Sequence, residues 1–323
     1  MQPIDIIIIV IFLVSLMGVG IWHGRTNKTS SDYFLGGRNL PWVIAMFSIV
    51  ATETSVLTFV SVPGLAYRGD WLFLQLAMGY IVGRILVSQI LLPIYFKDGI
   101  TSIYEVIGNK FGNDVQKIAS FVFLVTRILA DGVRFLATAV IIQVITEWSL
   151  PFAVIIIGIV TLIYTLSGGI KTVVWLDSIQ FILYLAGGII TIIFILNQLD
   201  GSILSIFQTL NDSSKLQVFK FNWNIFTDSW SFLSAVIGGI FLSFASHGTD
   251  HMMVQRVLVC RDLPSAKKAM IGSGLFVFIQ FTIFLFAGSL IWVLLGNTEI
   301  IKDREFSTFI VEHLPIGLKG LLL

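Results

Sequence analysis

Long apolar runs separated by short polar stretches dominate this chain of 323 residues. A run of about 20 apolar residues is long enough to cross a bilayer as a helix. The pattern therefore predicts eight complete transmembrane helices, and a ninth that begins near Pro315 and is cut off at Leu323. The eight predicted spans are 6–22, 41–65, 72–96, 117–146, 152–166, 173–197, 231–255 and 269–295. The segments predicted between them are polar loops at 23–40, 198–230 and 297–314 and an amphipathic stretch at 97–116.

Composition supports an all-α polytopic membrane protein. Hydrophobic residues make up 56% of the chain and charged residues 12%, against about 25% charged residues in a soluble domain. The single cysteine, Cys260, excludes a disulfide within the chain and a cysteine-rich metal site. No basic stretch is long enough to indicate nucleic-acid binding. The first apolar run follows Asp5 and lacks a basic leader, so we expect a retained helix and not a cleaved signal peptide.

Lysine and arginine are unevenly divided between alternate predicted loops. The loops at 23–40, 97–117, 168–172 and 256–268 together hold eleven of them, and the opposite set holds six. Cytoplasmic loops carry the excess of positive charge. This distribution predicts a multi-pass protein of the cell membrane with its N-terminus outside. Three further arginines lie within predicted spans: Arg84, Arg127 and Arg134.

Two predicted spans contain polar islands. The span 41–65 reads Ala-Thr-Glu-Thr-Ser-Val-Leu-Thr over residues 51–58, and the span 231–255 becomes polar from Ser243 to Asp250. Four predicted helices separate the two. Helices interrupted near the bilayer midplane, one in each of two inverted repeats, are typical of secondary transporters. The alternative is that small polar residues only allow close helix packing, although packing has no use for the carboxylates of Glu53 and Asp250.

Asp177 stands a few residues inside an apolar segment that continues to about Leu196. A carboxylate in hydrocarbon is costly, so such residues usually face a water-filled cavity, an ion or a partner charge. The alternative, an aspartate solvated at the edge of the membrane, remains open from position alone.

Four motifs resemble the sodium:solute symporter family. They are Tyr33–Arg38 with Leu40-Pro41-Trp42, Gly168–Gln180, Val254–Leu258 with the following Arg261–Ala269, and Leu314–Leu322. The resemblance implies a LeuT-type inverted-repeat helical bundle with one extra N-terminal helix, and a single transmembrane domain over 1–323. It would place the extra helix at 6–22, a first five-helix repeat at 41–197 and an incomplete second repeat at 231–323.

The resemblance also implies ligands. Sodium would bind the carbonyls of Ala51 and Thr54, with Asp177 as the acidic ligand or neighbour of the ion. Ser55 and Thr58 match substrate positions of the family, and Gln75 lies near a polar position of the pocket. His247 and Asp250, in the second polar island, are further candidates for lining the pocket.

Glu53 departs from the family pattern, because sugar-binding relatives often carry a neutral residue there. The alternatives are that it binds an amine or hydroxyl groups of the substrate, or that it pairs with Arg127 or Arg134. Those arginines are seven residues apart and share a helix face, with Asp131 between them. Either one of them binds an anionic substrate or both are paired internally.

The predicted function is sodium-coupled symport of a small polar organic solute (a sugar, sugar acid, amino acid or carboxylate) by alternating access. The alternative is a symporter-like membrane sensor or regulatory module. Na+ is the coupling ion, and the expected partners are the solute, sodium and the lipid bilayer. No nucleophile–base pair or P-loop indicates an enzyme. His247 and His251 have metal-binding spacing, but Gly248 stands where a zincin motif has glutamate, so no metal beyond sodium is expected.

The resemblance places the serine-rich part of the eighth core helix, which completes the family's sodium site, just past Leu323. The expectation is therefore a fragment or abbreviated product of a longer transporter, truncated in that helix, which does not transport alone.

Overall fold

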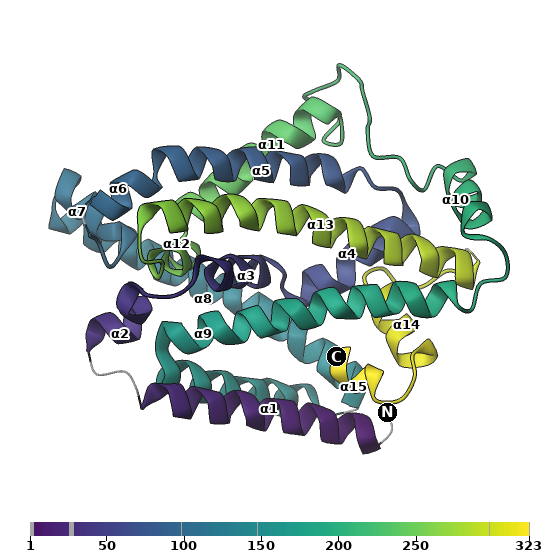
Figure 1. Ribbon diagram of the computed structural model, residues 1–323, viewed down its shortest axis with the longest axis horizontal. Coiled ribbons are helices and arrows are strands. Elements are labelled where there is room, and N and C mark those ends of the chain that lie inside the picture. Colours follow the sequence, from purple (N-terminus) through teal and green to yellow (C-terminus); the bar gives the residue numbers. More distant parts are fainter. Residues whose placement is uncertain (1–2, 26–28, 98, 147, 297, 323) are drawn as a thin grey trace.

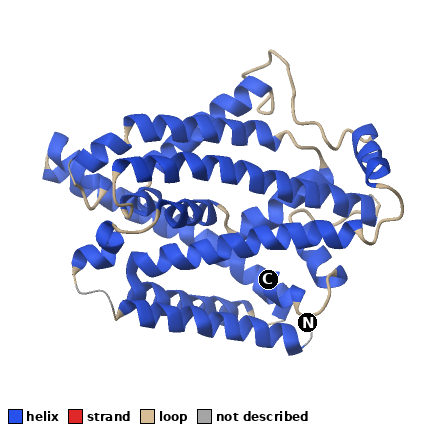
Figure 2. Ribbon diagram, in the orientation of Figure 1, coloured by secondary structure: helices blue, strands red, loops and turns tan. Residues whose placement is uncertain are grey.

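The fold consists of helices and connecting loops. The computed structural model describes residues 3–25, 29–97, 99–146, 148–296 and 298–322. Within these ranges it contains no strand, only an isolated bridge between Leu40 and Cys260 (Figure 2). Among the described residues, four helices are long and apolar enough to cross a membrane, or up to six if each of two bent helix pairs is one span.

Every predicted span corresponds to a helix or a bent pair of helices. The long helices are α1 (Pro3–Gly24), α5 (Phe73–Ile90) with its continuation α6 (Leu92–Lys97), α8 (Asn113–Thr146), α9 (Leu150–Leu196) and α13 (Leu263–Leu295). Of these, α8 carries Arg127, Asp131 and Arg134 near its middle.

Helix α9 contains two predicted spans in one hydrogen-bonded element. Its backbone turns at Gly169, where φ is 63° and ψ is −169°, a conformation that glycine adopts without steric cost. The two arms run in opposite directions from this turn (Figure 1). The first arm packs against α1 so closely that a Cβ atom on Gly20 would lie 2.6 Å from Cα of Tyr164. The predicted loop at 168–172 is thus reduced to a tight turn.

The two spans with polar islands are both broken. Helix α3 (Trp42–Glu53) is bent by 63° relative to the part of α4 (Val56–Arg68) that begins at Thr58. Helix α11 (Phe232–Gly248) is bent by 66° relative to α12 (His251–Leu258). Two residues separate the helices of each pair.

Glycines bring α5 and α11 into contact. A Cβ atom on Gly79 would lie 2.2 Å from the carbonyl oxygen of Val236, and one on Gly239 would lie 2.3 Å from that of Leu76. Neither position accepts a side chain without moving the backbone of the other helix. The contact fixes α5 beside the second broken span and so positions the residues of α5 near the site described below.

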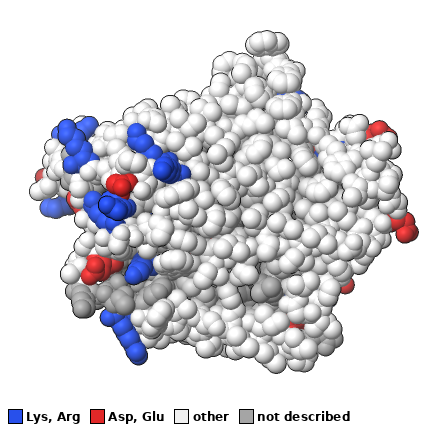
Figure 3. All heavy atoms as spheres, in the orientation of Figure 1, with Lys and Arg blue, Asp and Glu red and all other residues white. Residues whose placement is uncertain are grey.

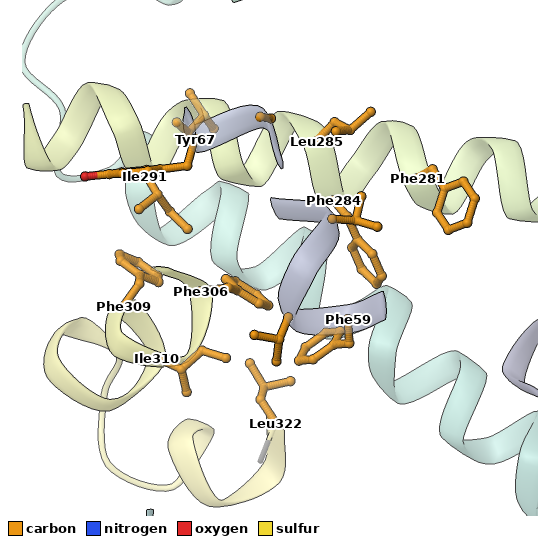
Figure 4. Packing of buried hydrophobic residues seen from close by; sticks show 14 of the residues in the cluster. Phe59, Tyr67, Phe281, Phe284, Leu285, Ile291, Phe306, Phe309, Ile310 and Leu322 are labelled. Atoms are coloured by element: carbon orange, nitrogen blue, oxygen red, sulfur yellow. The ribbon is translucent and has the colours of Figure 1, made fainter. Parts of the chain in front are cut away.

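One predicted polar loop, 297–314, contains a buried helix, so the prediction of a loop was wrong over α14 (Glu305–His313). Phe306, Phe309 and Ile310 are fully buried at the spacing of one helical face. Phe306 stacks edge-on against Phe59 of α4, with 5.0 Å between the ring centroids (Figure 4). This apolar face holds α14 on α4 and α13.

Short helices fill the remaining connections. In the predicted loop 198–230, α10 (Ile203–Asp212) buries Ile206 and Leu210, one turn apart. Capping boxes begin α2 (Ser30–Leu35) and α7 (Ile103–Phe111). The other short elements are the 3-10 turn η1 (Gly36–Arg38) and α15 (Leu318–Leu322).

Candidate functional site

Asp177 joins α9 to α3 and α12 through one carboxylate oxygen. Ser48 Oγ donates to Oδ2 at 2.7 Å and Thr52 Oγ1 lies 3.3 Å from the same atom. Nε and Nη2 of Arg256 each lie 3.1 Å from it as well. The Asp177 side chain is 17% exposed. From its position alone, Asp177 was expected to face a water-filled cavity, an ion or a partner charge, or to be solvated at the edge of the membrane. The structure gives it a partner charge, Arg256.

The break between α3 and α4 releases a backbone carbonyl. The N–H of Ser55 donates to the carbonyl of Glu53 at 3.1 Å, so it does not continue the helical ladder to Ala51. Thr54, at φ −85° and ψ 78°, leaves the helical conformation. The predicted sodium donors Ala51 and Thr54 therefore lie at the unwound end of α3, on the turn that follows Ser48.

The Thr54 side chain has its own buried partner. Its hydroxyl donates to Oε1 of Gln280 on α13 at 2.9 Å. The two residues are 1% and 0% exposed respectively. This bond ties the break to α13, so the Thr54 side chain contributes to the site independently of its carbonyl.

Glu53 is paired with Arg84. The guanidinium donates through Nη2 to Oε2 of Glu53 and through Nη1 to Ser273 Oγ, the latter at 2.7 Å. Arg84 is fully buried. Pairing of Glu53 with Arg127 or Arg134 was therefore the wrong alternative: α5, held against α11 by the glycine contact, brings a different arginine to the break.

His247, in the last turn of α11, lies next to the Glu53–Arg84 pair. Its Nε2 is 3.7 Å from Oε2 of Glu53, and its Nδ1 is 2.8 Å from Ser246 Oγ. The ring is buried. The structure thus brings two predicted pocket residues, one from each broken span, to the same place.

The two arginines of α8 are paired with carboxylates. Arg127 lies 2.8 Å from Asp131 and 3.3 Å from Asp250, and Arg134 lies 3.7 Å from Asp131. Asp250 also caps α12, accepting from the backbone N–H groups of the next helical turn at 2.9 and 3.2 Å. Internal pairing is the alternative that this geometry favours.

Three further predicted substrate residues lie in two places. Ser55 and Thr58 follow the break, with their hydroxyl oxygens 3.5 Å apart, and Thr58 Oγ1 is 3.4 Å from the Glu53 carbonyl. Gln75 is buried elsewhere, against the loop after α10. Its amide accepts from Lys220 N–H and donates to the Trp230 carbonyl, each at 3.1 Å, so the structure gives this side chain a role in holding the loop.

The same loop carries a stabilised carboxylate. Lys220 Nζ lies 2.8 Å from Asp228 and Asn222 donates to it at 2.7 Å. The hydrogen bond from Lys220, followed by those from Asn222 and the Trp230 backbone, lowers the pKa of Asp228 to about 2. The carboxylate therefore remains ionised throughout the physiological range.

Sequence reasoning missed several residues that complete the site. Ser48 and Thr52 place hydroxyls at i and i+4 on an apolar helix just before the break, a pattern that marks one polar face. Arg84 was visible as an arginine inside an apolar span, without an assigned partner. Over the described ranges, no group of three histidine, cysteine or acidic side chains is arranged to hold a metal ion.

The chain is similar to known membrane transporters. The sequence model described as the sodium:solute symporter family matches residues 33–323. The sodium/sialic acid symporter SiaT of Proteus mirabilis is 30% identical, and the match covers 97% of this chain and 64% of the relative. NanT of Aliivibrio fischeri, also a sodium/sialic acid symporter, is 28% identical over 97% of this chain and 63% of the relative. The chain thus spans just under two thirds of the length of these relatives.

A more distant relative and a solved structure agree. The human sodium/iodide cotransporter is 26% identical over 97% of this chain and 50% of its own length. A substrate-bound, outward-open structure of a Na+-coupled sialic acid symporter matches with a TM-score of 0.90 at 28% identity, covering 99% of this chain and 69% of that one. The all-helical polytopic fold is therefore the LeuT-type fold of that symporter.

Proposed function

Because the chain belongs to the sodium:solute symporter family, we propose that it serves sodium-coupled symport of a small polar organic solute by alternating access. The observation that carries the proposal is the broken α3–α4 span. Its unwound end presents a released carbonyl at Ala51 one turn from the hydroxyls that hold Asp177. Unwound backbone beside a carboxylate is a means of binding a cation within a bilayer.

We propose the carbonyls of Ala51 and Thr54, with Asp177, as sodium ligands. Carbonyl and carboxylate oxygens are hard donors, which suit a hard alkali cation. The hydrogen bonds and ion pair of Asp177 all end on Oδ2, and Oδ1 accepts none from the part of the chain that the structure describes. That oxygen is available to a cation.

The solute would bind just beyond the break. Ser55 and Thr58 offer hydroxyls there, while the partly exposed Glu53 offers a carboxylate oxygen whose charge Arg84 balances. The named relatives are symporters for sialic acid and a cotransporter for iodide, and others are named for monocarboxylates. The proposed class is a sugar, sugar acid, amino acid or carboxylate.

The charge distribution supports an orientation with the N-terminus outside. Lysine and arginine gather at the end of the molecule where α2, α6, α7 and α12 lie (Figure 3). The N-terminus lies at the opposite end (Figure 1). If the positive end faces the cytoplasm, the breaks in the two bent spans lie between the two membrane surfaces. We also propose the division into an extra helix at 6–22, a first repeat at 41–197 and a second repeat from 231.

Substitution of Asp177 by Asn tests the sodium site. The change keeps the size of the side chain and removes its charge, so the apparent sodium affinity of solute uptake should fall about ten-fold or more, on the order of 1.4 kcal/mol. Uptake by the full-length protein in proteoliposomes is measured against sodium concentration. Asp114→Asn is the matched control, because Asp114 is 97% exposed on α8. Unchanged sodium dependence in the Asp177 variant would contradict the assignment.

A further inference from the structure

Arg256 lies on the carboxylate that we propose as a sodium ligand. Two of its nitrogens lie 3.1 Å from Oδ2 of Asp177. Its third nitrogen, Nη1, donates to the Met252 carbonyl at 2.8 Å, one turn back along α12. The side chain is 6% exposed. The guanidinium is therefore a fixed and buried positive charge, held to α12 and aimed at Asp177.

The charge of Asp177 is already balanced in this arrangement. Attraction between opposite charges is strong where water is largely excluded, and so is repulsion between like charges. A sodium ion at the unoccupied Oδ1 would meet the guanidinium across a single carboxyl group. The sodium ion and the guanidinium therefore compete for one negative charge.

The guanidinium belongs to a helix, α12, that is anchored at both ends. At the start of α12, Asp250 pairs with Arg127 of α8 at 3.3 Å. In its last turn, Arg256 pairs with Asp177 of α9. Both anchors join the second half of a bent span to helices outside it. A displacement of α12 relative to α9 would withdraw the guanidinium from the carboxylate.

We propose that Arg256 is a tethered cation that competes with sodium for Asp177, and thereby sets the sodium affinity of the site. The proposal rests on the proposed sodium-coupled function. It assigns to Arg256 a positioning role on α12: sodium binding and withdrawal of the guanidinium favour each other, as linkage requires for two events that share one group.

The test is sodium binding by purified variants of the full-length protein, followed as the rise of Tm when sodium replaces choline at constant ionic strength. Arg256→Gln removes the competing charge. The sodium concentration that gives half of the rise in Tm should therefore fall by about ten-fold or more. Arg256→Lys keeps a charge in place and should remain within about three-fold of the unmodified protein. Arg134→Gln is the matched control, because Arg134 also pairs with an aspartate but is 50% exposed on α8, and it should have no effect.

If Arg256 only stabilised the structure around Asp177, Arg256→Gln would weaken sodium binding instead of strengthening it. Unchanged or weaker sodium binding in Arg256→Gln would overturn the proposal. If that variant does not fold, Arg256→Met is measured in its place, because it removes the charge, keeps Asp177 and retains an apolar stem, and it should show the same shift to lower sodium concentration. A sodium response in the unmodified protein that Arg256→Gln leaves intact contradicts only this inference. The absence of any sodium response in all variants, together with no sodium-dependent uptake, contradicts the proposed function as well.

Discussion

The two bent spans have nearly the same shape and opposite electrostatics. The bends are 63° at α3–α4 and 66° at α11–α12. Glu53 is the last residue of α3, so its carboxylate stands at the negative end of a helix dipole. Asp250 is the N-cap of α12, at the positive end, and two backbone N–H groups donate to it. The first carboxylate is opposed by its helix and the second is supported by it.

This difference shows which break depends on distant residues. Asp250 is stabilised largely by its own chain, through the backbone N–H groups of Met252 and Met253. Glu53 depends on Arg84, a fully buried side chain on another helix, which is anchored in turn by Ser273 on α13. A costly charge in a membrane protein usually marks a functional position, which agrees with our proposal that the solute binds at the first break.

The largest effect is expected from Glu53→Gln. The substitution leaves the Arg84 guanidinium buried without its carboxylate, and removing one partner of a buried ion pair costs about 3–5 kcal/mol. The free energy of unfolding in detergent, from denaturant titration of helicity, measures the loss.

The double variant Glu53→Gln/Arg84→Gln is the control for this loss. It removes both charges and retains polar side chains of similar shape, so it should recover a large part of the stability. A single variant that loses less than about 1 kcal/mol would mean that water reaches Arg84 and that the first break is no more demanding than the second.

An intermediate effect is expected from Thr54→Val. Valine keeps the shape of the side chain but leaves Gln280 Oε1 without its donor in a fully buried position. The cost should be about 1–3 kcal/mol, measured by the same unfolding titration. Thr249→Val is the corresponding change at the second break, where the exposed hydroxyl donates to the Ala245 carbonyl of its own helix. If the Thr249 variant loses as much stability, the first break is not specifically tied to α13.

The smallest effect is expected from Asp250→Asn. Asparagine caps a helix as well as aspartate does, so only the partly exposed ion pair with Arg127 is lost, and the change should stay within about 1 kcal/mol. Asp250→Ala removes the cap too, and should cost about 0.5–2 kcal/mol. Equal losses in the two variants would show that the ion pair, and not the cap, stabilises the second break.

The apolar pattern predicted the helices well because their length and composition are local properties. The family resemblance was confirmed by the sequence and structure matches. Pairing of the buried charges was not predictable, because an apolar run does not specify how a helix is rotated about its axis. Arg84 reaches Glu53 from α5, a helix that glycines hold against α11. Gln75, on the same helix, faces a loop backbone. The α14 helix was overlooked although Phe306, Phe309 and Ile310 already showed a helical period.

The glycine contact between α5 and α11 can form only late in synthesis of the chain. Gly79 and Gly239 meet in the folded protein but are about 160 residues apart in the chain. At synthesis rates of about 5–20 residues per second, the surface around Gly79 waits roughly 10–30 s for its partner. During that interval a nascent α5 presents a small-residue surface of the kind that associates with other membrane helices. A larger residue at Gly79 would clash with the backbone of α11 when that helix arrives, so it should reduce the yield of correctly assembled protein during synthesis.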